Sequence, residues 1–279
     1  MESLFYHVQQ EHRSFPRVNL GKKHSTCRFC GSSVSTFNNR SHTLPEFLGN
    51  KTVFNLDECD QCNAFFGQEF EPNLKKFLPP SWYCRTKGKK GYVKSTVSNN
   101  TVISANGRGI SVNVAQDKKY LEVIHRGSKY NSLLVYKSLL KILISLVPTK
   151  YIDEFSNAID WLMNADKFET LVHKPIVSFA EALPDSRRQD QLEIILVREA
   201  VTFFGIYELQ INFNNCRLKL PFSPMQYCHF DYGSVLPARN HLECFTFQEI
   251  DFSNYSCKHA YVLKIDSENS RIDISKKYA

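Results

Sequence analysis

Apolar positions with helical spacing mark three segments of the chain. In residues 131–147 apolar side chains recur every three or four positions and Pro148 follows, which predicts a helix that ends at the proline. Residues 151–165 have the same period, and the short turn between them predicts an antiparallel helical pair. Residues 63–78 carry a third apolar stripe, within which Pro72 predicts a break or a kink.

Strand-like patterns dominate the second half of the chain. Expected strands are residues 192–197, 207–213 and 217–222, with a final hairpin formed by 260–266 and 270–275. Residues 88–113 combine β-branched residues with Gly and Asn turns and predict further hairpins. Residues 1–24 have no clear period, and we expect a short helix there followed by an extended arm. The chain is therefore predicted to be an α+β protein with a mainly antiparallel sheet.

Composition indicates a globular chain with a large core and no membrane span. Of the 279 residues, 42% are hydrophobic and 23% are charged. The most apolar stretch, residues 133–147, is too short and too interrupted by lysines to cross a bilayer. The first residues are mixed and polar, so we expect no signal peptide.

The net charge of +7 is unevenly distributed. Residues 72–94 contain cations and no acidic residue, a pattern that could follow a phosphate backbone. An ordinary solvated basic loop is the alternative interpretation. The candidate nucleic-acid-binding residues of this basic run are Lys75, Lys76, Arg85, Lys87, Lys89, Lys90 and Lys94.

Four of the nine cysteines form two Cys-x-x-Cys pairs, Cys27/Cys30 and Cys59/Cys62. Either pair alone could be a coincidence or a redox pair, whereas two pairs so close together predict a structural zinc ion bound by four thiolates. The spacer of 28 residues between the pairs is longer than the ~15–20 of a simple ribbon, so a segment is looped out of the zinc clamp. The odd cysteine count and the metal-type spacing favour a reducing compartment, and we expect a cytoplasmic protein.

The segments SHTLPEFLGNK and NLDECDQCNAFFG resemble the HNH endonuclease family, in particular members with two zinc knuckles around a ββα-metal core. The resemblance covers about residues 24–95. His42 begins an H-x-x-P-E-x-L-G segment, Asn63 directly follows the second knuckle, and Asn55 lies a few residues before it. The resemblance implies a small zinc-stapled ββα-metal domain over residues 1–97, followed by an α+β domain of unknown function over residues 98–279.

The resemblance also implies a mechanism. His42 would act as general base and take a proton from a water molecule that attacks the phosphodiester. One divalent ion, Mg²⁺ or another cation, would be held partly by Asn63 and stabilise the leaving group. Asn55 would orient His42 by a hydrogen bond from the ring or to the loop backbone, and the basic run would hold DNA.

Ser41 departs from the family pattern, because many HNH proteins carry an acidic residue or a histidine immediately before the catalytic histidine. A serine hydroxyl is a poor Mg²⁺ ligand. Candidate replacements are the carboxylates of Glu46, Asp57, Glu58 and Glu71.

Three functions remain open at this level. The first is a metal-dependent DNA endonuclease, and the second is a catalytically inactive, zinc-stabilised nucleic-acid-binding protein. In the third, the zinc unit is a structural staple and residues 98–279 carry the activity. That second domain could also bind a protein partner or a second copy of the chain.

Overall fold

The computed structural model describes residues 1–10, 16–23, 26–78, 87–88, 91–92, 94–98, 101–105, 110–113, 120–126, 130–166, 175–182, 191–201, 204–213, 216–224, 245–251, 259–266 and 271–278. Statements about structure below concern these residues.

The largest element is a six-stranded antiparallel sheet with the order β1-β12-β13-β14-β11-β15. Its central strands alternate between buried apolar and more exposed polar positions, as the sequence pattern predicts. The strands are β1 (Glu2–Gln10), β11 (Ile176–Ala182), β12 (Gln191–Val201), β13 (Phe204–Phe213), β14 (Cys216–Phe222) and β15 (Phe245–Asp251).

The first strand, β1, corrects one expectation. A short helix was predicted in residues 1–24, but residues 2–10 form an edge strand that pairs antiparallel with β12. The pairing joins the start of the chain to residues far along it, which local periodicity does not reveal. Strand β1 belongs to the predicted first domain, residues 1–97, whereas the other five strands of its sheet belong to the predicted second domain, residues 98–279.

Smaller sheets complete the strand content of the described residues. The predicted final hairpin is confirmed as β16 (His259–Asp266) and β17 (Arg271–Tyr278), and β10 (Tyr120–Arg126) pairs with β16. The predicted hairpins of residues 88–113 appear as two small antiparallel sheets. They contain β5 (Lys87–Gly88) with β6 (Gly91–Tyr92), and β7 (Lys94–Ser98), β8 (Thr101–Ala105) and β9 (Ile110–Asn113).

In the sequence, β1 is followed by a unit of short strands and one long helix. Strand β4 (Val53–Asn55) pairs parallel with β2 (Val18–Leu20) and antiparallel with β3 (Ser41–His42). A 3₁₀ turn, η1 (Glu46–Leu48), lies between β3 and β4. We call residues 18–77, which comprise these short strands, the 3₁₀ turn and the helix described next, the knuckle unit.

The helix of the knuckle unit runs without interruption from residue 60 to residue 77 in three parts. These are α1 (Asp60–Phe65), a π-type stretch η2 (Phe66–Phe70) and α2 (Glu71–Phe77). Pro72 has no N–H to donate and its ring crowds the preceding turn, and the wider π-type turns lie directly before it. The irregularity predicted at Pro72 is thus a local widening and not an end of the helix.

The next helix, α4 (Ser132–Leu146), confirms the strongest helix prediction. The side chain of Asn131 accepts hydrogen bonds from the N–H groups of Leu133 and Leu134 and caps its first turn. A 3₁₀ segment, η3 (Thr149–Phe155), and α5 (Ser156–Asn164) follow, so the second predicted helix begins a few residues later than its apolar pattern. No helix in the described ranges is long and apolar enough to cross a membrane.

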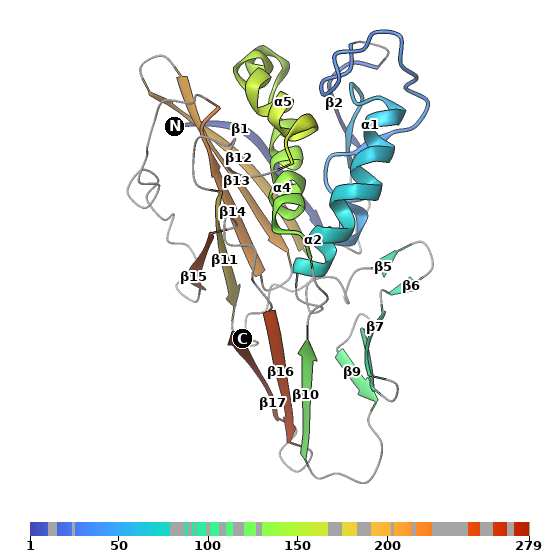
Figure 1. Ribbon diagram of the computed structural model, residues 1–279, viewed down its shortest axis with the longest axis vertical. Helices are drawn as coiled ribbons and strands as arrows, with labels where there is room; N and C mark the ends of the chain where they lie inside the picture. Colours follow the sequence, from blue (N-terminus) through green and yellow to red (C-terminus); the bar gives the residue numbers. More distant parts are fainter. Residues whose placement is uncertain are drawn as a thin grey trace.

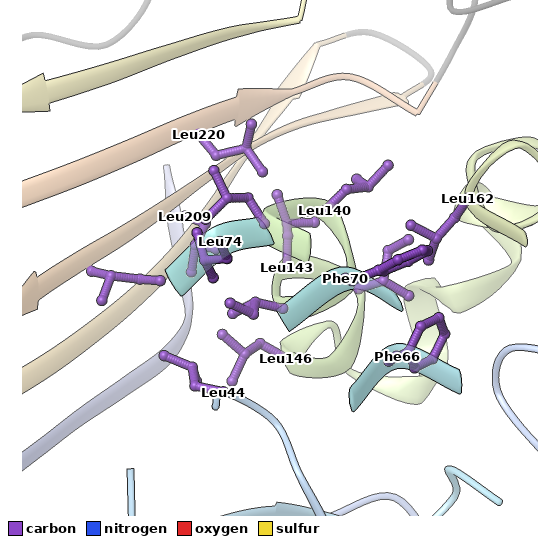
Figure 2. Close-up of a cluster of buried hydrophobic side chains, with 14 of the residues drawn as sticks. Leu44, Phe66, Phe70, Leu74, Leu140, Leu143, Leu146, Leu162, Leu209 and Leu220 are labelled. Carbon is purple, nitrogen blue, oxygen red and sulfur yellow. The ribbon is translucent and has the colours of Figure 1, made fainter. Parts of the chain in front are cut away.

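Helix α4 lies at the centre of the molecule (Figure 1), against one face of the six-stranded sheet and beside the helix of the knuckle unit. Figure 2 shows Phe70 and Leu74 of that helix meeting Leu140 and Leu143 of α4, with Leu209 of the sheet close by. All five side chains are buried in one hydrophobic cluster. The knuckle unit therefore shares its core with the sheet, because α4 is buried on nearly all sides in the cluster that contains both.

Candidate active site and metal centre

The four predicted zinc cysteines lie together, with all their Sγ atoms within 4.8 Å of one another. The Sγ atoms are 3.8 Å apart both in the Cys27–Cys62 pair and in the Cys30–Cys59 pair. A tetrahedral zinc with Zn–S bonds of about 2.3 Å needs sulfur–sulfur edges of about 3.8 Å, whereas a disulfide needs about 2 Å. The donor set and its spacing therefore fit a Zn(Cys)₄ centre.

Backbone donors reach two of the four sulfur atoms. The N–H groups of Cys59 and Cys62 point to the Sγ atoms of Cys27 and Cys59, at 3.4 and 3.5 Å. The hydrogen bond with Cys62 lowers the pKa of Cys27 to about 4, although burial opposes this, whereas the same bond raises the pKa of Cys62 and burial raises that of Cys30. Gly31 ends the first knuckle with a φ of 68°, a conformation that side chains with a Cβ adopt rarely.

Arg28, inside the first knuckle, ties the zinc segment to α4. Its guanidinium binds both carboxylate oxygens of Asp57 at 3.0 Å. The same group donates to the carbonyl oxygens of Ile144 and Val147 at 2.8 and 2.7 Å, at the C-terminal end of α4. Helix ends leave carbonyls short of internal donors; Ile144 already accepts from the N–H of Val147 at 3.3 Å, and Arg28 adds a second donor there and one at Val147. Arg28 therefore acts as a side-chain cap from outside the helix.

His42 lies on the two-residue edge strand β3, with 27% of its side chain exposed. Its ring packs on Phe54 with a centroid distance of 4.7 Å, and its Nε2 lies 3.2 Å from Oε1 of Glu46. Nδ1 is buried, so exchange of protons with water is left to Nε2. A histidine with one reachable nitrogen beside a carboxylate can accept a proton and be stabilised in its charged form.

The four candidate carboxylates near His42 have different surroundings. Asp57 is engaged by Arg28, and Glu58 is fully buried with its Oε2 3.0 Å from Nζ of Lys141. Burial raises the pKa of Glu58 to about 7, with Lys141 opposing. Glu46 lies beside Nε2 of His42, and Glu71 is half-buried.

Glu46 and Glu71 influence each other electrostatically. Burial raises the pKa of Glu71, Lys141 opposes the shift, and the negative charge of Glu46 adds to it. Mutual repulsion of two carboxylates is relieved by a cation between or beside them.

Asn55 lies apart from the ring that it was expected to orient. Ser41 faces Asn55 and His42 faces Phe54 in the β3–β4 pair, so Asn55 and His42 are on opposite faces of the two strands. The Asn55 side chain is fully buried and makes no hydrogen bond to any described residue. Neither predicted hydrogen bond of Asn55 is therefore present.

Asn63 lies in α1 immediately after the second knuckle, half-buried. Its backbone N–H bonds the carbonyl of Cys59 at 2.9 Å, which fixes it to the zinc segment. Ser41 is buried, and its hydroxyl donates to the carbonyl oxygen of Glu58 at 3.4 Å. Ser41 therefore points away from the His42 face and does not take the place of the acidic residue that many HNH proteins carry there.

Part of the basic run can be placed. Lys75 and Lys76 are exposed in the last turn of α2. Lys87 and Lys94 belong to strands β5 and β7. Arg85, Lys89 and Lys90 lie outside the described residues.

The structure adds two residues that sequence reasoning did not assign to the site, Arg28 and Lys141. Lys141 lies on α4, and its Nζ donates to the carbonyl oxygen of His42 at 3.0 Å. The available signal was a lysine at an inward position of an apolar helix, but its partners depend on how α4 packs against the knuckle unit.

Comparison with known proteins supports the resemblance for the knuckle unit. A family model described as HNH endonuclease matches residues 27–79, from the first zinc cysteine to the end of the helix. No curated protein and no solved structure matches the chain. Residues 27–79 are therefore similar to an HNH endonuclease domain, which suggests a nuclease function.

Proposed function

We propose that this protein is a metal-dependent HNH endonuclease that hydrolyses phosphodiester bonds of DNA. The observation that carries the proposal is the placement of His42. It is partly exposed on an edge strand beside a four-cysteine cluster, with Glu46 within 3.2 Å of its Nε2, inside the segment matched by the HNH family model. The zinc-stapled ββα arrangement of β3, β4 and α1 belongs to the same proposal.

His42 acts as general base at Nε2. That nitrogen takes a proton from a water molecule, the water oxygen attacks the phosphorus, and the bond to the leaving sugar oxygen breaks. Glu46 then accepts a hydrogen bond from the protonated ring and stabilises its charge. The ring stays in place because it packs on Phe54.

We assign the divalent cation to oxygen donors of the matched segment. Asn63 is half-buried in α1, and amide and carboxylate oxygens are the ligands that Mg²⁺ prefers. A cation held by Asn63 with Glu46 or Glu71 would neutralise charge on the phosphate and on the leaving oxygen. In this arrangement Glu46 and Glu71 supply the carboxylate that Ser41 lacks.

Zinc has a separate, structural role in the proposal. The four cysteines hold the two knuckles together, and the site residues are attached to that frame. Lys75 and Lys76 contribute phosphate contacts with little sequence preference.

The test is nicking of supercoiled plasmid DNA with Mg²⁺ or Mn²⁺. Wild type should nick the plasmid, and His42→Ala should lower the rate by at least about a hundredfold while keeping its zinc content and its DNA affinity. Glu71→Gln should also reduce nicking, and Glu69→Gln, an exposed neighbour on the same helix, is the matched control. Equal nicking by wild type and His42→Ala would refute the proposal. DNA binding with a steep salt dependence but no cleavage with any metal would identify the inactive binding protein instead.

A further inference from the structure

Helix α4 contains two lysines although nearly all of its side chains are buried. Lys137 and Lys141 are 4% and 5% exposed. Lys137 donates to the carbonyl oxygen of Ala165 and lies over the rings of Phe70 and Trp161. Lys141 points instead into the knuckle unit, where it meets groups that belong to the candidate active site.

The ammonium of Lys141 has two polar partners and two aromatic ones. Its Nζ lies 3.0 Å from the carbonyl oxygen of His42 and 3.0 Å from Oε2 of Glu58. It also lies over the rings of Phe29 and Phe66, at 6.0 and 5.5 Å from their centroids. Every partner belongs to the segment matched by the HNH family model, whereas Lys141 itself lies outside that segment.

A buried ion pair of this kind is weak evidence for stabilisation. The free-energy cost of removing two charges from water offsets much of their mutual attraction. Proteins in which apolar residues replace the whole pair are often as stable as the original. The pair is therefore better explained by what it holds in place than by its contribution to folding.

The geometry of β3 shows what is held. The Thr43 N–H bonds the carbonyl of Val53, so the carbonyl of His42 is turned away from β4, on the outer side of the pair. β3 is an edge strand, and none of the strands in the described part of the chain lies on that side to bind this carbonyl. The Nζ of Lys141 instead donates the hydrogen bond that a neighbouring strand would give to this carbonyl, and the carbonyl belongs to the residue proposed as the base.

We propose that Lys141 is a positioning residue for His42, through which α4 fixes the backbone of the catalytic strand. The proposal rests on the proposed nuclease function. It extends the active site beyond the family segment, since the side chain that fixes the base comes from the second part of the chain. Misplacement of a catalytic group by about 1 Å can lower a rate by about a hundredfold.

The test separates positioning from neutralisation of Glu58. Lys141→Met alone would leave the Glu58 carboxylate buried without its partner and could prevent folding, so the informative variant is Lys141→Met/Glu58→Gln, which removes both charges. Glu58→Gln alone keeps the bond from Lys141 to His42 and is the matched reference. Lys137→Met controls for loss of a buried lysine on the same helix.

Positioning predicts that the double variant binds zinc and has a KM for DNA within about threefold of Glu58→Gln, but a kcat at least about tenfold lower. Lys137→Met should keep the wild-type kcat. Equal kcat values for the double variant and Glu58→Gln would overturn the inference and leave Lys141 as a counter-ion only.

A second readout does not depend on activity. The Thr43 amide, bonded to Val53, should exchange with solvent about fivefold faster in the double variant than in Glu58→Gln, the equivalent of one ordinary hydrogen bond. Equal protection would refute positioning even if wild type cuts no DNA, and absence of wild-type cleavage with faster Thr43 exchange would refute only the nuclease function.

Discussion

Replacement of Arg28 by Met should be among the most destabilising single changes in the knuckle unit. The Arg28 side chain is 2% exposed and makes two bonds to Asp57 and further bonds to carbonyls at the end of α4. Removing one partner of a buried ion pair typically costs about 3–5 kcal/mol, because the other charge stays buried without compensation. The carbonyls of α4 lose their donor at the same time, so the upper part of that range is expected.

Urea unfolding of the zinc-loaded protein, followed by far-UV circular dichroism, measures this loss. The midpoint should fall with an unchanged m-value. Arg28→Lys keeps one charge but cannot form the bidentate fork, and an intermediate loss is expected. Arg40→Met, at an exposed position in the same unit, should stay within about 0.5 kcal/mol of wild type.

A double variant tests the reasoning directly. Arg28→Met/Asp57→Leu removes the stranded carboxylate and should recover at least about 2 kcal/mol of the loss seen in Arg28→Met. If Arg28→Met changes the free energy of unfolding by less than about 1 kcal/mol, or if the double variant is no more stable than the single one, the link between the first knuckle and α4 does not hold the two elements together.

Three further outcomes are expected. Gly49→Ala should lower the stability of the folded protein by about 1–3 kcal/mol in thermal unfolding, because the φ of Gly49 is 88° and a Cβ there would lie 2.6 Å from the ring of Phe213. Gly67→Ala is the control: Gly67 lies in a helix with open space around it, and this change should raise the stability by up to about 1 kcal/mol. Burial lowers the pKa of Lys137 to about 8, with Asp166 opposing, so the folded state binds fewer protons than the unfolded state and stability should rise as the pH increases above 8 towards 10.5. Lys137→Met should remove that rise, and equal pH slopes for wild type and variant would contradict it. Chelation of zinc should unfold the knuckle unit, seen as loss of its amide protection, and restored protection on adding Zn²⁺ is the control.

Local patterns in the sequence were sufficient for the zinc cysteines and for the elements with a strong period. Each Cys-x-x-Cys pair can place two thiolates on one metal ion, and zinc needs four. The grouping of Cys27 and Cys30 with Cys59 and Cys62 could therefore be predicted without the fold. Helix α4 could be predicted because its apolar period is long and Pro148 ends it.

Contacts between distant segments could not be predicted in this way. β1 has no period of its own and becomes a strand by pairing with β12. Arg28 reaches Ile144 across 116 residues of sequence, and Lys141 reaches His42 across 99. The expected role of Asn55 came from family resemblance, and the strand register puts its side chain on the other face from His42.

β1 also bears on the order in which the chain is assembled. Gln9 donates from its amide to the carbonyl of Gly49 at 2.7 Å, and its Oε1 accepts from the N–H of Lys51 and the hydroxyl of Thr52. The loop that follows His42 is thus braced by a strand whose strand partner, among the residues that the structure describes, is β12, residues 191–201. On a ribosome the zinc segment emerges before α4 and β12, so the nascent chain carries its candidate base before the brace exists. If the proposed function holds, cleavage competence should therefore arise only after β12 has been synthesised.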